Sequence, residues 1–267
     1  MRVSIDHRTR YRFTEPQARL IQMLRLTPQD STDQTVVNWH IGVDCDARLR
    51  QARDGFGNRV TMLYAEGPIT DIEIAVQGEV LTAGDAGLVR GVAEPLPPVL
   101  FVRTTDRTET SLVMREFAQS LAGEGIDWLH ALNGALHERF DLSEDHHDTG
   151  QTAEQAFLSR DASPRDYAHM LVALARAEGV PARYVSGYHT SDADDGHAPH
   201  AWAEAYVDGV GWIAFDPSRG VAADEQYVRL AVALDAAGAA PVAGSRIGRG
   251  REALDVEVQV EAVAAEE

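Results

Sequence analysis

The sequence predicts an α+β protein, with an antiparallel β-sheet first and a region of helices followed by strands second. Three patterns lead to this prediction. Apolar and polar residues alternate with a period of two up to about residue 80, apolar residues recur at helical spacing between residues 111 and 178, and strand-like runs follow from residue 182. Because helices precede strands in the second region, we expect helices packed on an antiparallel sheet there.

In the first region the alternation is clearest at residues 72–80, where every second side chain is apolar, as on a half-buried strand. The segment Asp54-Gly55-Phe56-Gly57-Asn58 separates two such runs, and its glycines permit the positive φ angles of a tight turn. We expect a hairpin there. Residues 84–98 are rich in Gly and Pro and form the expected linker. The predicted division is a β-rich N-terminal domain over residues 1–98 and a core domain over residues 99–267.

The second region begins with four expected helices, over residues 111–121, 127–140, 151–159 and 164–178. The last of them is followed by Gly179, which is a typical C-cap residue. Strand-like runs then occur at residues 182–189, 201–207, 212–215, 227–234 and 254–260. The Gly- and Ala-rich residues 236–250 are expected to form a loop.

Composition argues against several classes of function. A net charge of −18 disfavours nucleic acid and anionic membrane as partners, because both attract clustered Lys and Arg. Cys45 is the single cysteine, so no internal disulfide can form, and the N-terminus lacks the basic and then apolar stretch of a secretory signal. No run approaches the ~20 apolar residues of a membrane helix. We therefore expect a cytoplasmic protein.

A histidine and a carboxylate occur in the order that a cysteine-type acyl-transfer site requires. His200 begins one expected strand and Asp216 ends the next, so the two side chains can meet across an antiparallel pair, where a carboxylate orients an imidazole. We expect this contact. No cysteine accompanies the pair, because Cys45 lies far upstream in strand-like sequence.

These residues resemble the transglutaminase-like superfamily, specifically the bacterial transglutaminase-like cysteine peptidases with a β-rich N-terminal domain. The resemblance covers nearly the whole chain. It rests on Asp166-Tyr167-Ala168-His169, Pro181-Ala182-Arg183-Tyr184-Val185-Ser186-Gly187-Tyr188, His200-Ala201-Trp202-Ala203-Glu204 and Phe215-Asp216-Pro217, in that order. It implies a transglutaminase- or papain-like core in which His200 and Asp216 belong to a catalytic triad. Trp202, Tyr188 and Asp166 are the candidate substrate-binding residues.

The departure from the family pattern falls at the nucleophile. In the family the cysteine opens a helix in a Gly-x-Cys-x-Asp-aromatic-Ala-His stretch, and counting back from Asp166 places Pro164 at the cysteine position. Proline has no thiol and no backbone N–H, although the amide of the nucleophile commonly helps to hold the oxyanion, which is worth ~3 kcal/mol in comparable sites. The sequence therefore indicates a triad without its nucleophile.

Ser163 is the candidate substitute nucleophile. A shift of one residue at a helix start turns a side chain by ~100°, which points Ser163 away from a base placed to meet position 164. Ser163, Pro164 and Asp166 also form a helix-start signature, with Ser at the N-cap, Pro at N1 and an acid at N3. We expect helix capping from Ser163 rather than catalysis.

Acidic segments that contain histidine are the candidate metal ligands. They include Asp145, His146, His147, Asp148, His189, Asp192, Asp194, Asp195, His197 and His200. Their spacing matches no tight metal motif, so we expect neither a metal nor another cofactor.

Three functions are compatible with these observations. The first is a non-catalytic family member whose cleft binds a peptide or a protein. The second is an amide hydrolase or acyl transferase that uses Ser163, a metal or a residue outside the motif. The third is an interaction module that acts through the N-terminal sheet. The resemblance implies a protein partner such as an ATP-grasp-type ligase, whereas the sequence defines neither the substrate nor the oligomeric state.

Overall fold

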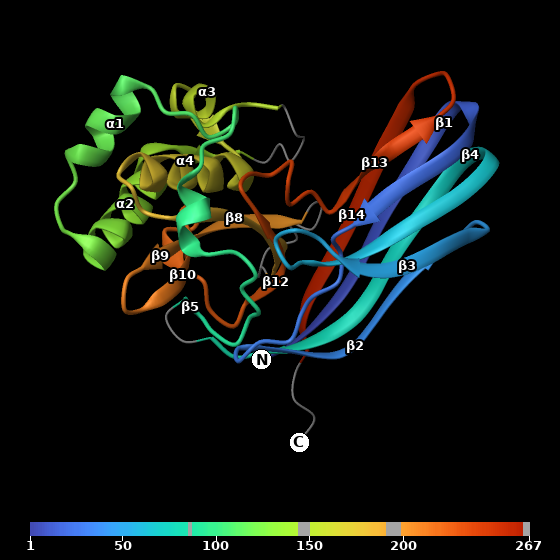
Figure 1. The fold of residues 1–267 in the computed structure, drawn as a ribbon, viewed down its shortest axis with the longest axis horizontal. Coiled ribbons are helices and arrows are strands. Elements are labelled where there is room, and N and C mark those ends of the chain that lie inside the picture. The colour runs from blue at the N-terminus through green and yellow to red at the C-terminus, as the bar shows by residue number, and fades with distance from the viewer. Residues whose placement is uncertain (85–86, 144–149, 191–198, 264–267) are drawn as a thin grey trace.

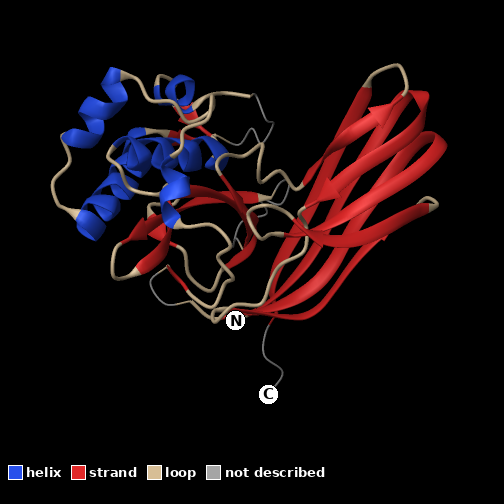
Figure 2. Ribbon diagram, in the orientation of Figure 1, coloured by secondary structure: helices blue, strands red, loops and turns tan. Residues whose placement is uncertain are grey.

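The computed structural model describes residues 1–84, 87–143, 150–190 and 199–263 and shows a sheet of long strands beside a smaller sheet that carries the helices (Figure 1). Figure 2 shows the helices gathered on one side of the molecule and the long strands on the other. The α+β class predicted from the sequence is confirmed.

The first sheet is antiparallel and is organised around two long strands. β1 (Arg2–Leu24) and β4 (Arg59–Thr82) pair along most of their lengths. β2 (Gln34–Val43) and β3 (Ala47–Arg53) both pair with β4. The turn between β3 and β4 is the predicted hairpin: the amide of Asp54 donates to the carbonyl of Asn58 at 3.1 Å, and Gly57 has a φ of 87°.

The end of the chain corrects the predicted organisation. β13 (Val242–Ile247) lies in the segment expected to be a loop, and β14 (Glu252–Val263) was expected in the sheet of the core domain. Both pair with β1 in the first sheet. The alternation of apolar residues in β14 indicates a strand but not its partner, since that pairing joins the two ends of the chain. The boundary at residue 98 stays a prediction, but these last two strands belong with the N-terminal sheet.

The second sheet has the strand order β11-β10-β9-β8-β12. Its members are β8 (Ala182–His189), β9 (His200–Val207), β10 (Gly211–Asp216), β11 (Val221–Ala222) and β12 (Tyr227–Ala233). A short strand from the expected linker, β5 (Leu88–Val89), pairs with β10. A further two-stranded parallel sheet joins β6 (Asp141–Leu142) to β7 (Asp161–Ala162).

The four predicted helices are present. They are α1 (Leu112–Gln119), α2 (Gly125–Arg139), α3 (Ala153–Phe157) and α4 (Pro164–Ala177), and a short 3-10 helix, η1 (Pro98–Val102), precedes them. In β9, Ala203 and Ala205 belong to the apolar core that α4 shares with the sheet. Because side chains alternate along a strand, His200, Trp202 and Glu204 lie on the opposite face of β9.

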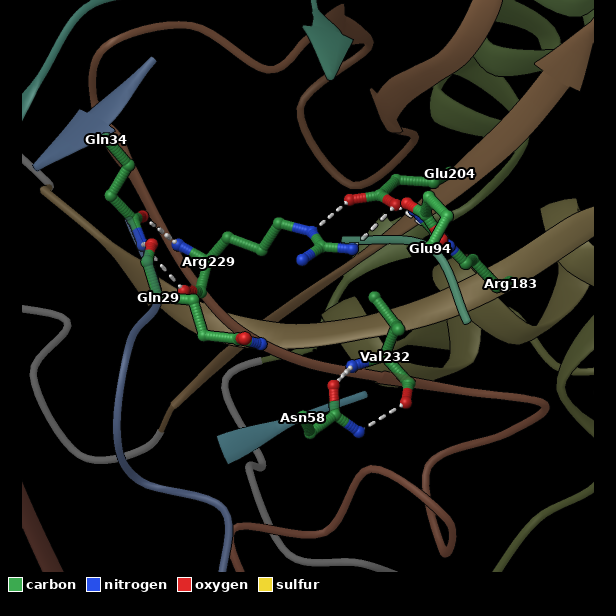
Figure 3. A network of polar contacts seen from close by, with 8 residues as sticks. All are labelled: Gln29, Gln34, Asn58, Glu94, Arg183, Glu204, Arg229 and Val232. Atoms are coloured by element: carbon green, nitrogen blue, oxygen red, sulfur yellow. Dashed lines mark hydrogen bonds and ion pairs between the residues drawn. The ribbon is translucent and has the colours of Figure 1, made fainter. Parts of the chain in front are cut away.

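Two side-chain amides of the first sheet dock on β12, the last strand of the second sheet (Figure 3). Asn58 donates to the carbonyl of Val232 at 2.8 Å and accepts from its amide at 2.9 Å. Gln34 makes the same pair of bonds with the backbone of Arg229, at 3.1 and 2.8 Å. Both amides imitate a neighbouring strand, so they satisfy backbone groups that a strand at the edge of a sheet would otherwise leave unpaired.

We predict that Asn58→Ala destabilises the protein by ~1–3 kcal/mol, because the buried N–H and C=O of Val232 would lose their partners. Urea unfolding followed by circular dichroism measures this change. Asn38→Ala is the matched control, since the Asn38 side chain bonds Glu79 on the exposed surface. Equal stability of the Asn58→Ala variant and the wild type would contradict a role for this amide in docking.

Candidate functional site

His200 and Asp216 are in direct contact, as expected from their places on neighbouring strands. Nε2 of His200 lies 2.6 Å from Oδ2 of Asp216, and the His200 side chain is 15% exposed whereas that of Asp216 is fully buried. A short bond to a buried carboxylate fixes the tautomer in which Nε2 carries the proton. Nδ1 of His200 is then the ring nitrogen that can accept a proton from another group.

The carboxylate of Asp216 accepts three more hydrogen bonds. The amide and the hydroxyl of Ser218 donate to Oδ1 at 2.9 and 2.6 Å, and the hydroxyl of Tyr227 donates to Oδ2 at 2.8 Å. Burial raises the pKa of Asp216, but the charge and hydrogen bond of His200, together with the bonds from Ser218 and Tyr227, outweigh burial and hold this pKa at about 2. Asp216 is therefore ionised at neutral pH and oriented toward the imidazole.

Aromatic rings surround the imidazole of His200. The ring centroids of His189, Tyr227 and Trp202 lie 5.3, 5.9 and 6.2 Å from that of His200. Burial, and then the neighbouring charge of His200, lower the pKa of His189 to about 4. His189 is thus neutral near pH 7, and the pair sits in a partly apolar setting in which a charge–charge contact is strengthened.

The candidate metal ligands divide into two groups. Within the described residues, no three His, Cys, Asp or Glu side chains are placed to hold a metal ion. His189 and His200 lie beside each other at the pair described above. The remaining candidates lie outside the described residues; they are Asp145, His146, His147, Asp148, Asp192, Asp194, Asp195 and His197.

The start of α4 forms the predicted cap. The hydroxyl of Ser163 donates to Oδ2 of Asp166 at 2.7 Å, and the amides of Ser163 and Asp166 bond the opposite side chain at 3.0 and 3.3 Å. Pro164 occupies the first helical turn. The hydroxyl of Ser163 is therefore committed to Asp166, and its hydrogen-bond partners in the described part of the chain do not include His200. Asp166, a candidate substrate-binding residue, is the other half of this cap.

The first turns of α4 lie beside the strand that carries His200. Ala168 packs in one cluster with Ala201, the residue next to His200. Burial raises the pKa of Tyr167 to about 12, and the charge of Asp216 contributes to this shift after that of Asp141. α4 is thus packed against β9 next to the position of His200, within electrostatic range of Asp216.

The two aromatic candidates for substrate binding have different surroundings. Tyr188 is 1% exposed, belongs to the apolar core between the sheets, and its hydroxyl lies 2.8 Å from Nδ1 of His7. Tyr188 thus joins β8 to β1, and its expected contact with a substrate stays a prediction. Trp202 is also 1% exposed, but it lines a cavity between the sheets.

A buried charge network escaped the sequence analysis (Figure 3). Glu204 is fully buried and accepts from Nε of Arg183 and from Nε of Arg229, both at 2.6 Å. Glu94, in the expected linker, binds the other two nitrogens of Arg183 at 2.6 and 2.7 Å. Arg183 and Glu204 stand within two of the quoted motifs, and they are directly opposite each other on β8 and β9. That cross-strand register was the signal that could have identified the pair.

The network is neutral as a whole, and its buried carboxylate is stabilised in the charged form. Burial raises the pKa of Glu204, but the charges of Arg183 and Arg229 outweigh burial and lower this pKa to about 2. The Arg183 guanidinium also lies 3.9 Å from the ring centroid of Trp212. The network therefore ties β8, β9 and β12 to each other and to the linker residue Glu94.

Comparison with known families agrees with this architecture. Residues 3–81 match the bacterial transglutaminase-like N-terminal region, and residues 115–217 match the transglutaminase-like superfamily. Residues 115–217 thus form a region of the transglutaminase-like superfamily. Among relatives, ML0607 of Mycobacterium leprae is 26% identical and the match covers 97% of this chain and 98% of that protein. Rv2569c of Mycobacterium tuberculosis is also 26% identical, covering 91% of this chain and 87% of the relative.

A solved structure shows the same fold over the whole chain. A provisionally assigned cysteine protease from Cytophaga hutchinsonii superposes with a TM-score of 0.79 at 20% sequence identity, covering 100% of this chain and 92% of that one. None of the described helices is both long enough and apolar enough to span a membrane.

We predict that Glu204→Gln destabilises the protein at neutral pH by ~3–5 kcal/mol, because two buried arginines would lose their shared counter-charge. The folded-state pKa of about 2 lies below the ordinary value of 4.5. The contribution of this ionisation to stability is therefore present above pH 4.5 and is lost as the pH falls toward 2. Guanidinium unfolding between pH 2 and pH 7 should show a smaller acid-dependent loss of stability in the variant than in the wild type.

Asp141→Asn is the control for this measurement. Asp141 pairs with Arg160 at 2.9 Å, but their side chains are 65% and 87% exposed, so the substitution should leave stability almost unchanged. A Glu204→Gln variant as stable as Asp141→Asn would show that the network does not support the fold.

Proposed function

We propose that this protein is a non-catalytic member of the transglutaminase-like superfamily that binds a peptide or a protein. The observation that carries the proposal is the residue that opens α4. Pro164 stands where the family resemblance calls for the nucleophilic cysteine, and Cys45, the single cysteine, lies between β2 and β3 of the first sheet. Proline supplies neither a thiol nor a backbone N–H to an oxyanion.

The surroundings of Ser163 support the same proposal. A hydroxyl nucleophile needs a base within hydrogen-bond reach, whereas this hydroxyl donates to Asp166 in the cap of α4. Moving it toward the imidazole would require the loss of that cap. In our proposal His200 and Asp216 persist as an oriented polar pair, and the surrounding cleft retains a binding role.

The partner in this proposal is a peptide or a protein, and an ATP-grasp-type ligase is the class that the family resemblance suggests. The net charge of −18 supports a partner other than nucleic acid or an anionic membrane. A single cysteine is compatible with a reducing cytoplasmic setting, which is the location we propose.

One observation favours the alternative, an active amidase or acyl transferase. His200 and Asp216 keep the 2.6 Å contact and the ionised carboxylate that a general base requires, and Nδ1 of His200 has no hydrogen-bond partner among the described residues. If a serine hydroxyl or a metal-bound water replaced the thiol as nucleophile, this pair could still accept its proton. The two functions therefore differ in whether the purified protein turns over a substrate.

We predict that the purified protein does not hydrolyse peptides or glutamine amides and does not transfer their acyl groups, with or without a chelator present. Ammonia release and peptide cleavage measure turnover. The matched variants are His200→Ala, which removes the base, and Ser163→Ala, which removes the hydroxyl. Turnover that His200→Ala abolishes would refute the non-catalytic assignment, and loss in Ser163→Ala or with chelator would identify the replacement nucleophile.

Restoring the thiol tests whether residue 164 occupies the nucleophile position. In a Cys45→Ala background, Pro164→Cys leaves one thiol, at the N-terminus of α4, where we propose that it faces the His200–Asp216 pair. A helix N-terminus and a nearby imidazole both lower a thiol pKa, so we predict alkylation by iodoacetamide near pH 7 at least ~10-fold faster than that of an unperturbed thiol. Mass spectrometry follows the reaction, and addition of His200→Ala should slow it.

Ser163→Cys in the same background is the control, because its side chain is turned by ~100° around the helix axis. A thiol at position 164 that reacts no faster than one at 163 would contradict the placement of residue 164 opposite the base. Circular dichroism of each variant establishes that α4 is intact.

A further inference from the structure

A cavity of about 80 Å³ lies between the two sheets, on the face of β9 opposite to α4. One wall comes from the connection between β1 and β2 and includes Asp33. The other comes from the second sheet and the segment before β12, and includes Trp202, Asp224, Tyr227 and Arg229. Neither Pro164 nor His200 belongs to the lining, but Trp202 and Tyr227 do, so the cavity adjoins the His200–Asp216 pair through these two side chains.

Two polar atoms of the lining are buried without a hydrogen-bond partner. They are the indole Nε1 of Trp202, whose side chain is 1% exposed, and Oδ2 of Asp33. A buried tryptophan N–H usually finds an acceptor, and leaving such a group unpaired destabilises the folded protein. A donor and an acceptor left unpaired in the walls of one cavity point to an occupant that can satisfy both.

The charges of the lining favour an occupant that carries a positively charged group. Glu204 is neutralised by its two arginines. Asp33 and Asp224 have no arginine partner among the described residues, so the cavity keeps negative charge. Its aromatic wall consists of Trp202 and Tyr227, with ring centroids 5.3 Å apart. Carboxylates beside aromatic faces are a favourable environment for an ammonium group.

The unpaired hydrogen-bond donors of the lining favour an occupant that also carries an acceptor oxygen. Arg229 uses Nε and Nη2 on Glu204, whereas its Nη1 has no partner among the described residues (Figure 3). Together with the indole N–H of Trp202, it offers a donor to an oxygen of the occupant. The volume admits only a few non-hydrogen atoms, so a single compact group fits rather than a length of chain.

We propose that this cavity binds an α-ammonium group and the carbonyl oxygen next to it, as they occur in a free amino acid and at the amino terminus of a peptide. The ammonium would donate to Asp33, and the carbonyl would accept from Trp202 or Arg229. This inference goes beyond the proposed function, because it needs no statement about residue 164. Its failure would leave the role of His200 and Asp216 untouched.

Isothermal titration calorimetry of the full chain with glycinamide tests the proposal. Glycinamide should bind saturably, and N-acetylglycinamide, which lacks the ammonium, should bind at least tenfold more weakly or not at all. Glycine and triglycine amide distinguish the two sources: tighter binding of glycine indicates a free amino acid, and tighter binding of triglycine amide indicates a peptide terminus. Either result supports binding of an α-ammonium group and the carbonyl oxygen next to it.

Asp33→Asn and Trp202→Phe should each weaken glycinamide at least tenfold. Asp30→Asn is the matched control, because it makes the same charge change in the same connection outside the cavity, and it should bind like the wild type. Thermal unfolding of each variant shows whether it is folded. If Trp202→Phe is unfolded, the binding measurement on Asp33→Asn decides the test. Absence of saturable binding to the wild type, which indicates a cavity filled by water only, would overturn the proposal. Equal binding of N-acetylglycinamide, or no effect of Asp33→Asn, would also overturn it.

Discussion

The carboxylate of Glu204 is the charge on which the arrangement of the second sheet depends. It is fully buried on β9 and is held between an arginine of β8 and an arginine of β12. An unpaired carboxylate at this depth would cost several kcal/mol, so the three strands must keep the spacing and register at which both guanidinium groups reach it. β12 is also the strand on which Asn58 and Gln34 dock. The same interaction therefore also fixes the position of the strand on which the first sheet docks.

The charge network and the His200–Asp216 pair are built on the same strands. On β9, His200 and Glu204 share a face, and on β12, Tyr227 and Arg229 occupy alternate positions of one face. Arg229 binds Glu204 on β9, while Tyr227 donates to Asp216 on β10, with β8 and β9 lying between β12 and β10. Holding β12 in register with β9 thus holds the hydroxyl that orients Asp216. This is a physical reason for the pair to stay ordered in a protein that offers it no thiol.

The sequence predicted those features that depend on local pattern. Helical spacing located α4, and its capping residues predicted the Ser163–Asp166 cap, because these interactions span three residues. It could not predict that β14 pairs with β1, since alternation specifies a strand and not its neighbour. The Arg183–Glu94 contact and the burial of Tyr188 against His7 were inaccessible for the same reason: each joins distant segments whose meeting depends on how the sheets pack.

Proline at residue 164, where we propose that the family's nucleophile is missing, need not disturb this fold. At the first turn of a helix the backbone N–H has no partner within the helix, so proline removes no hydrogen bond there, and its fixed φ suits the helical conformation. The reciprocal bonds of Ser163 and Asp166 satisfy the neighbouring amides. In our proposal the cost of proline therefore falls on catalysis, through the missing thiol and oxyanion donor, and not on stability. A scaffold whose register is set by Glu204 and whose helix start tolerates proline is therefore compatible with the proposed non-catalytic binding role.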